Sequence, residues 1–452
     1  MRLWFETALL PGGWADHVAI RLAPDGTIAA IDIGAPPAGS ANLGAAIPGL
    51  ANVHSHAFQR GMAGLAEFRG NPDDDFWSWR EIMYRFLDRL DPNDVEAIAA
   101  LAYIEMLESG FTRVGEFHYL HHQPDGTPYA NLAELAERIA AAAEQTGIGL
   151  TLLPVAYRHA GFGRRPPERG HIRFLNDPAR FARLFEASRH AIAALPDANI
   201  GVAPHSLRAV DHVELGDILT LAPAGPIHIH AAEQIREVED CIAALGARPV
   251  AWLIDNLPVD ERWCLIHATH LDPREIARLA ASGAVAGLCP LTEANLGDGI
   301  FPMPAYLEAG GRFGIGTDSN IAIDAARELE MIEYAQRLTH RRRNLLATPD
   351  QPSTGTRLFA AALAGSARAL GQPHPALEVG APADIVALDM GSASLLGRRT
   401  DQLLDSWIFS GSRDAVHHVW RRGRHVVVAR RHVARGSAEA RYRKTMEKLL
   451  GR

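Results

Sequence analysis

The feature that most constrains the fold is an alternation of short apolar runs with long Ala-, Leu- and Arg-rich stretches. It begins at Pro48-Gly49 and continues to about residue 370. The short runs have the length of buried β-strands, and the stretches between them have the length of helices. Eight such strand–helix units predict a (β/α)8 barrel of the TIM type. The predicted strands are 50–54, 112–117, 149–155, 200–204, 226–230, 263–267, 285–288 and 312–317.

The two ends of the chain carry a different pattern. The apolar runs 18–22 and 28–33 flank a turn at Pro24-Asp25-Gly26, and three more strand-like runs follow the barrel between residues 384 and 428. Neither group is large enough to enclose a core of its own. We therefore expect residues 1–47 and 376–452 to form one small composite domain, a β-sandwich, beside a barrel domain of residues 48–375.

Composition and charge exclude several classes of protein. Apolar residues make up 47% of the chain and charged residues 22%, as in ordinary globular proteins. The net charge of −8 gives no basic field for nucleic acid, and no apolar run is long enough to cross a membrane. Three cysteines indicate a reducing compartment without disulfides. We therefore expect a cytoplasmic protein that binds neither nucleic acid nor membranes.

Histidines and one aspartate stand at the ends of the predicted barrel strands. Residues two apart on a strand point to the same side, and the carboxyl ends of barrel strands face one site. The side chains therefore converge, and three imidazoles with one carboxylate suit zinc, with iron or manganese as the other options. Taken singly, each histidine also fits a structural role at a strand end. The residues concerned are His54 and His56 after the first strand, His228 and His230 at the fifth, His267 and His270 at the sixth, and Asp318 after the eighth.

The distribution of lysine indicates the number of ions. Only Lys444 and Lys448 occur, both at the C-terminal end, so the barrel offers no lysine that could be carboxylated to bridge two metals. The sequence therefore predicts one metal ion per chain.

One zinc ion would allow a hydrolytic reaction. It would lower the pKa of a bound water towards ~7, and the resulting hydroxide would attack a carbon made electrophilic by nitrogen or oxygen. Asp318 can accept the water's proton, Glu233 can carry it to a leaving nitrogen, and His267 can polarise the tetrahedral intermediate. The alternatives are a first-turn helix glutamate for Glu233 and a buried structural histidine for His267.

The pattern as a whole resembles the amidohydrolase superfamily, and the segment 379–386 resembles that superfamily's return into its β domain. The barrel without lysine and the stretch His230-Ala231-Ala232-Glu233 resemble its mononuclear deaminase branch. Four further segments resemble the formimidoylglutamate deiminases: 52–60 (NVHSHAFQR), 76–81 (FWSWRE), 115–120 (GEFHYL) and 203–208 (APHSLR).

This resemblance implies a zinc enzyme of histidine degradation, which hydrolyses N-formimidoyl-L-glutamate to N-formyl-L-glutamate and ammonia. A homodimer follows by analogy only. The resemblance places the metal ligands on His54, His56, His230 and Asp318, and the acid–base residues on Glu233 and His267. It places the substrate contacts on Gln59, Arg80, Tyr119, His205 and Arg208.

Two arginines fit a substrate with two carboxylates, because each guanidinium can hold one carboxylate with a planar fork. We place Arg80 in a loop beyond the first strand and Arg208 just before a helix. Their structural alternatives are a stacked surface group and a salt bridge. The sequence leaves open a related deaminase of another amidine or an amino-heterocycle, and, from a different class, a non-catalytic scaffold. Residues 162–175 form either a lid or a surface loop.

Overall fold

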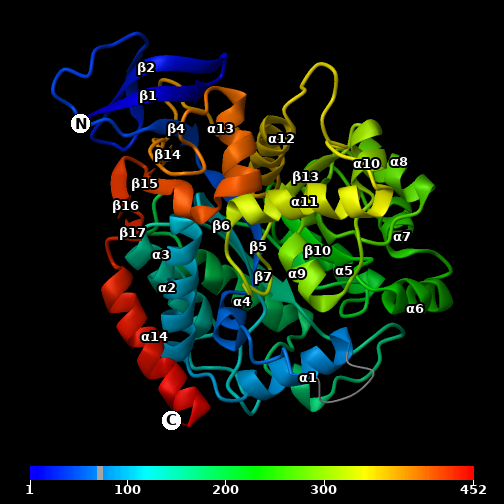
Figure 1. Cartoon of the computed structure of the whole chain (residues 1–452). Coiled ribbons are helices and arrows are strands. Elements are labelled where there is room, and N and C mark those ends of the chain that lie inside the picture. The colour runs from blue at the N-terminus through cyan, green and yellow to red at the C-terminus, as the bar shows by residue number, and fades with distance from the viewer. Residues whose placement is uncertain (69–74, 452) are drawn as a thin grey trace.

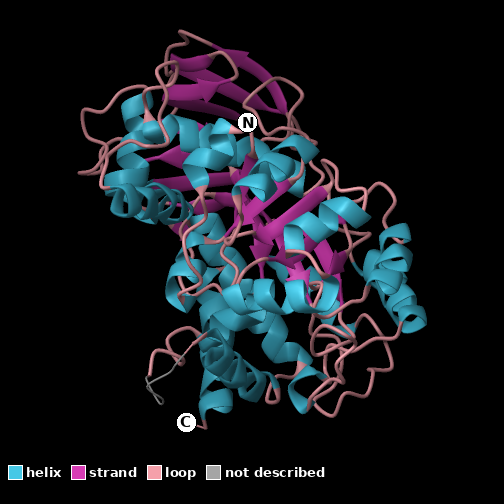
Figure 2. Ribbon diagram, turned by 90° about the vertical axis from the view of Figure 1, so that its right-hand side faces the viewer, coloured by secondary structure: helices cyan, strands magenta, loops and turns pink. Residues whose placement is uncertain are grey.

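The computed structural model describes residues 1–68 and 75–451, and it confirms the predicted barrel (Figures 1 and 2). The parallel strands follow the order β10-β11-β12-β13-β5-β6-β7-β8, and β9 also pairs with β7. Bridges from Val202 to Ile227 and from Ser206 to His230 join the last strand position to β10 and close the ring. The strands are β5 (Leu50–Ser55), β6 (Phe111–His118), β7 (Gly149–Ala156), β8 (Asn199–Ile200), β9 (Ala203–Pro204), β10 (Ile227–Ala231), β11 (Trp263–His267), β12 (Val285–Leu288) and β13 (Arg312–Ile315).

The fourth predicted strand, 200–204, is split into β8 and β9. Gly201 lies in the gap, where a Cβ would come within 2.3 Å of the carbonyl oxygen of Pro226. Only glycine permits this close approach of two backbones. The remaining strands are almost entirely buried, as expected for a parallel sheet covered by helices.

Helices surround the barrel strands (Figure 2). Several begin after an aspartate whose side chain accepts hydrogen bonds from free backbone N–H groups, as Asp91, Asp177 and Asp272 do. The helices are α1 (Phe76–Leu87), α2 (Pro92–Glu108), α3 (Glu134–Thr146), α4 (Pro178–Ala191), α5 (His212–Thr220), α6 (Ile235–Leu245), α7 (Pro249–Asn256), α8 (Pro273–Ser282), α9 (Pro290–Leu296), α10 (Met303–Glu308), α11 (Ala325–His340) and α12 (Thr354–Ala369), with short turns η1 (Ala57–Met62) and η2 (Arg169–His171).

The strands from both ends of the chain form one sheet, with the order β17-β16-β15-β14-β4-β1-β2-β3. Strand β4 joins the two ends, because it pairs with β1 on one side and with β14 on the other. The sheet curls over its own core. Phe5 on β1 and Trp420 on β15 are therefore in contact, although β4 and β14 lie between their strands. The strands are β1 (Arg2–Leu10), β2 (Gly13–Leu22), β3 (Ile28–Asp32), β4 (Ala45–Pro48), β14 (Ile385–Leu388), β15 (Val416–Arg421), β16 (Arg424–Val428) and β17 (Arg431–His432).

The rest of the C-terminal region is helical. It contains α13 (Asp401–Ser406), η3 (Trp407–Gly411), η4 (Arg413–Ala415) and α14 (Arg435–Leu450). Helix α14 lies along the barrel helix α2 (Figure 1), where Arg435 pairs with Glu108 and Lys448 with Asp94. The division of the chain after residues 47 and 375 stays a prediction.

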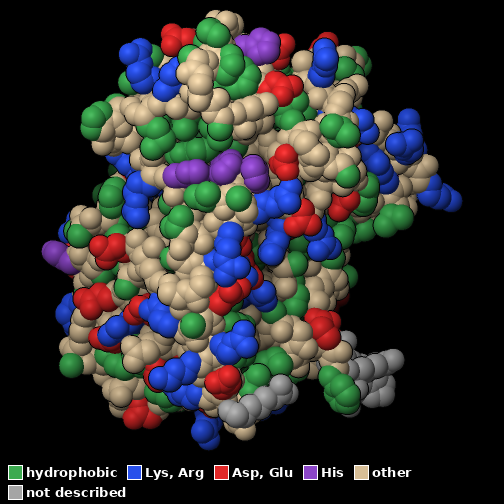
Figure 3. All heavy atoms as spheres, turned by 60° about the vertical axis from the view of Figure 1, so that its left-hand side comes forward, with side chains coloured by type: hydrophobic (Ala, Val, Ile, Leu, Met, Phe, Trp, Pro, Cys, Tyr) green, Lys and Arg blue, Asp and Glu red, His purple; other side chains and the backbone are tan. Residues whose placement is uncertain are grey.

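The charges on the surface and the hydropathy of the helices agree with what the composition predicts. On the face in Figure 3, the described Lys and Arg side chains are interspersed with Asp and Glu side chains. None of the helices in the described part of the chain combines the length and the hydropathy that a membrane-spanning helix needs.

The guanidinium of Arg421 connects the small sheet to the barrel. It is 3% exposed, and it donates hydrogen bonds to the carbonyl oxygen of Thr112 and to the carboxylates of Asp197 and Asp384. Thr112 lies on β6 and Asp384 just before β14, so this one side chain contacts both parts of the fold.

We predict that Arg421→Met lowers the free energy of unfolding by about 3 kcal/mol, because two carboxylates lose a buried cation. Arg430→Met is the matched control, since Arg430 pairs with Asp389 at the surface and is half exposed. It should cost less than about 1 kcal/mol. Thermal and urea unfolding measure both variants; equal losses would contradict a structural role for Arg421.

Candidate active site

The predicted site residues converge on one pocket at the carboxyl ends of the barrel strands. Except for His54, all of them line it. His54 lies beside the lining residue His230, with 3.1 Å between their Nε2 atoms. The predicted residues in the lining are His56, Gln59, Arg80, Tyr119, His205, Arg208, His230, Glu233, His267 and Asp318.

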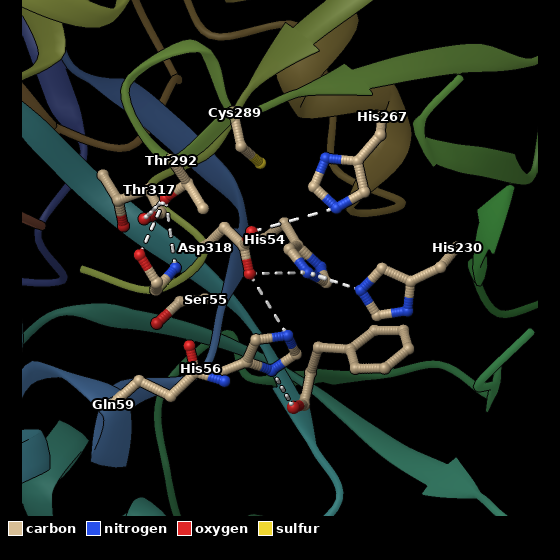
Figure 4. Close-up of polar contacts among 12 residues, drawn as sticks. His54, Ser55, His56, Gln59, His230, His267, Cys289, Thr292, Thr317 and Asp318 are labelled. Atoms are coloured by element: carbon tan, nitrogen blue, oxygen red, sulfur yellow. Dashed lines mark hydrogen bonds and ion pairs between the residues drawn. The ribbon is translucent and has the colours of Figure 1, made fainter. Parts of the chain in front are cut away.

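The four predicted metal ligands lie close together (Figure 4). Asp318 Oδ1 is 3.5 Å from His54 Nε2 and 3.3 Å from His56 Nε2. Three of the four, His54, His56 and Asp318, present ligand atoms within 4.8 Å of one another, and His54 forms a second such group with His230 and His267. Strand β5 carries His54 and is followed directly by His56, β10 and β11 carry His230 and His267, and the turn after β13 carries Asp318.

Backbone carbonyl groups hold two of the rings in place. His56 Nδ1 is 2.9 Å from the carbonyl oxygen of Phe117, and His230 Nδ1 is 3.0 Å from that of His205. A carbonyl oxygen only accepts, so each Nδ1 carries the proton and each Nε2 turns a lone pair towards the other ligands. Burial lowers the pKa of His54, His56 and His230, which keeps these imidazoles neutral.

This arrangement fits a divalent metal ion. Neutral imidazole nitrogens and a carboxylate are the donors that zinc and related ions take. In addition, the Nε2 atom of His267 is buried without a hydrogen-bond partner among the described residues, although it faces the same centre.

His267 lies between carboxylates. Its Nδ1 donates to Glu293 Oε1 at 3.1 Å, and its Nε2 is 3.7 Å from Glu233 Oε1 and 3.8 Å from Asp318 Oδ2. Burial alone would lower the pKa of His267, but Glu233, Glu293 and Asp318 together raise it to about 10. Burial raises the pKa of Glu233 to about 7. The two groups therefore form a cation beside a carboxyl that titrates near neutral pH, which is suited to proton transfer.

The backbone is strained where the ligands enter the site. His267 and Asp318 have φ values of +66° and +43°, and Ala232 and Asn320 are also left-handed. Such conformations cost ~1–3 kcal/mol each for residues other than glycine, and they persist where the surroundings fix them. They turn side chains from the strand ends into the pocket.

A buried polar network fixes the first and last strands relative to each other. Asn52 on β5 donates to Thr317 Oγ1, and Thr317 donates to Asn320 Oδ1. Asn320 in turn donates to Ser55 Oγ and to the carbonyl oxygen of His56. This network joins the segment that carries His54 and His56 to the turn that carries Asp318.

Arg80 lies on helix α1, not in a loop as expected. Asp75 caps this helix by accepting hydrogen bonds from the backbone N–H groups of Trp77 and Ser78. The aromatic residues at its start obscured the helical period, because two of them, Phe76 and Trp79, line the pocket. The sequence analysis gave stacking on an aromatic ring as the structural alternative for Arg80. This stacking does occur, since the Arg80 guanidinium lies 4.7 Å from the centre of the Trp77 ring.

Arg208 is 8% exposed, and its Nη2 is 3.9 Å from Glu233 Oε2, so it forms no close salt bridge with that carboxylate. The Nε atoms of Arg80 and Arg208 are both buried without a hydrogen-bond partner among the described residues. Gln59 donates to the Tyr119 hydroxyl at 2.7 Å, while its own Oε1 is buried and unpartnered in the described chain. The pocket thus offers free donors and an acceptor.

Sequence reasoning missed several residues of the site. Tyr84, Tyr157 and Phe174 line the pocket, and Phe174 lies in the segment 162–175. Tyr84 on α1 is 3.1 Å from His171 Nε2, so this segment forms part of the pocket wall. Glu293 and Asn320 act behind the ligands, where no motif marked them. Other histidines lie outside the site: His228 contacts the carbonyl oxygen of Ala369, and His270 that of Asp298.

Comparison with known proteins agrees with this geometry. The model of the amidohydrolase family matches residues 45–426. The formimidoylglutamate deiminase of Pseudomonas aeruginosa is 49% identical over 451 residues, which cover 99% of this chain and 98% of the relative. A crystal structure described as an amidohydrolase from Brucella melitensis is 52% identical, with a TM-score of 0.95 and 99% of each chain covered.

A zinc-bound adenosine deaminase from Xanthomonas campestris shares the fold, with a TM-score of 0.80 and 23% identity over 100% of this chain and 98% of its own. The family model matches most of the sequence, and the barrel strands present histidines and an aspartate to one centre. The chain therefore belongs to the amidohydrolase family, whose members are metal-dependent hydrolases.

Proposed function

We propose that this protein hydrolyses N-formimidoyl-L-glutamate to N-formyl-L-glutamate and ammonia, as a step of histidine degradation. The main support is the combination of a cluster of metal-ligating side chains with two arginines in the same pocket whose buried Nε atoms have no hydrogen-bond partner among the described residues. The formimidoylglutamate deiminase at 49% identity supports the same substrate.

The metal in this proposal is one zinc ion, held by His54, His56, His230 and Asp318, with Fe²⁺ or Mn²⁺ as the other options. Bound there, it would acidify a water molecule and so supply a nucleophile near neutral pH. The residues around it would then direct the proton and the substrate.

Proton transfer in this proposal uses Asp318, Glu233 and His267. Water adds to the formimidoyl carbon, and Asp318 and Glu233 take its protons and deliver them to the terminal nitrogen. The C–N bond to that nitrogen then breaks, ammonia leaves, and the carbon keeps the water's oxygen as the formyl group. A charged His267 would stabilise the oxygen as negative charge develops on it.

The substrate in this proposal is oriented by the other lining residues. Arg80 and Arg208 each bind one carboxylate, because their buried Nε atoms lack a hydrogen-bond partner in the part of the chain that the structure describes. Gln59 accepts a hydrogen bond from the formimidoyl group through its free Oε1, and Tyr119 and His205 complete the wall. A neutral amino-heterocycle would leave both guanidiniums unpaired, which disfavours the deaminases of such rings. Cytoplasmic location and a homodimer stay predictions; the cysteines, all free and buried, support the former.

The first prediction concerns the reaction and its metal. The zinc-loaded protein should release ammonia from N-formimidoyl-L-glutamate, with formylglutamate identified by mass. Dialysis against a chelator should abolish the release, and about one Zn²⁺ per chain should restore it. Metal analysis gives the stoichiometry. No release by a protein that holds its metal would discard this substrate.

The second prediction concerns Glu233. Glu233→Gln removes the proton carrier but keeps the shape, so kcat should fall by about 10³-fold with little change in substrate binding. Glu239→Gln on the exposed side of α6, the helix that begins two residues after Glu233, is the control. Glu233 lies just before α6, not in its first turn as the alternative had it, so near-normal turnover by Glu233→Gln would leave it a structural residue of this segment.

The third prediction concerns the arginines. Arg80→Met and Arg208→Met should each lower kcat/KM for formimidoylglutamate by about 10- to 100-fold, because each removes a charged hydrogen-bond donor. Neutral amidines should lose far less. Arg274→Met, at an exposed position of α8, controls for the change in net charge. Full activity of both pocket variants on formimidoylglutamate would rule out carboxylate binding there.

A further inference from the structure

Three guanidiniums surround the indole ring of Trp77 beside the pocket. The guanidinium carbon is 4.7 Å from the ring centre for Arg80, 5.7 Å for Arg208 and 4.9 Å for Arg236. All three distances lie within the range of a cation–π contact. Trp77 lies in the segment 76–81 that the sequence analysis singled out, but no role was assigned to it there, and no motif marked Arg236.

The cluster depends on the tertiary fold. Trp77, Arg80 and Tyr84 follow one another on one face of α1, at spacings of three and four residues. The guanidinium of Arg80 therefore lies near two rings, with 5.6 Å to the centre of Tyr84. Arg208 comes from the segment between β9 and α5, and Arg236 from the first turn of α6.

Like charges so close together need compensation, and Glu237 and Glu233 supply part of it for Arg208 without a close salt bridge. Arg208 is 3.9 Å from Glu233, and Arg236 is 3.9 Å from Asp240, both beyond hydrogen-bond distance. In the described part of the chain, Arg80 has no ion pair, and its Nε is buried without a partner. All three cations lie near the Trp77 ring, whose π-system carries partial negative charge on its face and so offsets part of their repulsion.

We propose that Trp77 is a positioning residue for carboxylate recognition: its ring holds the guanidiniums of Arg80 and Arg208 in place for the two carboxylates of the substrate. Arg236, which is exposed at the same ring, adds a third positive charge that attracts the dianion to the pocket. This inference rests on the proposed function and adds two specificity-determining residues to it.

The test compares Trp77→Leu, Trp77→Phe and the wild type on N-formimidoyl-L-glutamate and on N-formimidoyl-4-aminobutyrate, which has one carboxylate. Trp77→Leu should raise KM for the dicarboxylate by about 10-fold with little change in kcat, and Trp77→Phe should restore most of the loss. The effect on the monocarboxylate should be smaller. Trp14→Leu, at a half-buried position of the small sheet, is the matched control.

Arg236→Met should raise KM and make kcat/KM less sensitive to salt, since it removes a charge that acts at a distance. Arg274→Met should do neither. An unchanged KM in Trp77→Leu, an equal rise for both substrates, or a fall in kcat together with the thermal midpoint would overturn the positioning role.

Calorimetric binding of glutarate separates this inference from the proposed function. If the wild type releases no ammonia from formimidoylglutamate, the proposed function fails. Weaker glutarate binding by Trp77→Leu, by about 10-fold, would still support the role of Trp77. Equal binding by the two proteins, or none by the wild type, would overturn it.

Discussion

The structure depends on the gathering of several ionisable side chains at one buried centre. His54, His56, His230 and Asp318 all lie within the barrel with almost no exposure to solvent. Burial disfavours charge on the imidazoles, so they remain neutral and present their lone pairs inward. A group of this kind is costly to a folded protein unless a cation shares its lone pairs, and this cost is the physical reason for a metal ion at the centre.

The barrel determines where the ligands stand, and a small polar network determines how they point. Asn52, Thr317 and Asn320 connect residues that are 265 positions apart in the sequence. The left-handed backbone at Asp318 would relax if these hydrogen bonds were absent. Second-layer residues such as Asn320 and Glu293 thus keep the reacting groups in place.

Chemistry and recognition come from different parts of the molecule. The strand ends supply the proposed metal ligands and proton carriers, whereas α1 and the segment before α5 supply the two arginines proposed to bind carboxylates. Because Trp77 and Arg80 lie on one helix, a change in the position of α1 would move both together. A family with a fixed centre and variable surrounding segments can serve many substrates in this way.

The sequence by itself determined the barrel, the composite pairing of the two ends and the candidate ligands, because each depends on local periodicity. Strand-end positions put His54, His56, His230 and Asp318 at one face as soon as the strands close into a ring. The functional roles stay predictions, although the structure brings all the named residues together.

Only the tertiary structure decided which residues support the predicted site residues from outside the pocket and which ones surround the arginines. Arg80 lies on a helix because of the cap at Asp75, and Glu293 reaches His267 across 26 residues of chain. The meeting of Trp77 with Arg208 and Arg236 joins segments more than a hundred residues apart, so no local pattern records it. Such contacts form through the packing of whole elements, and a sequence pattern describes one element at a time.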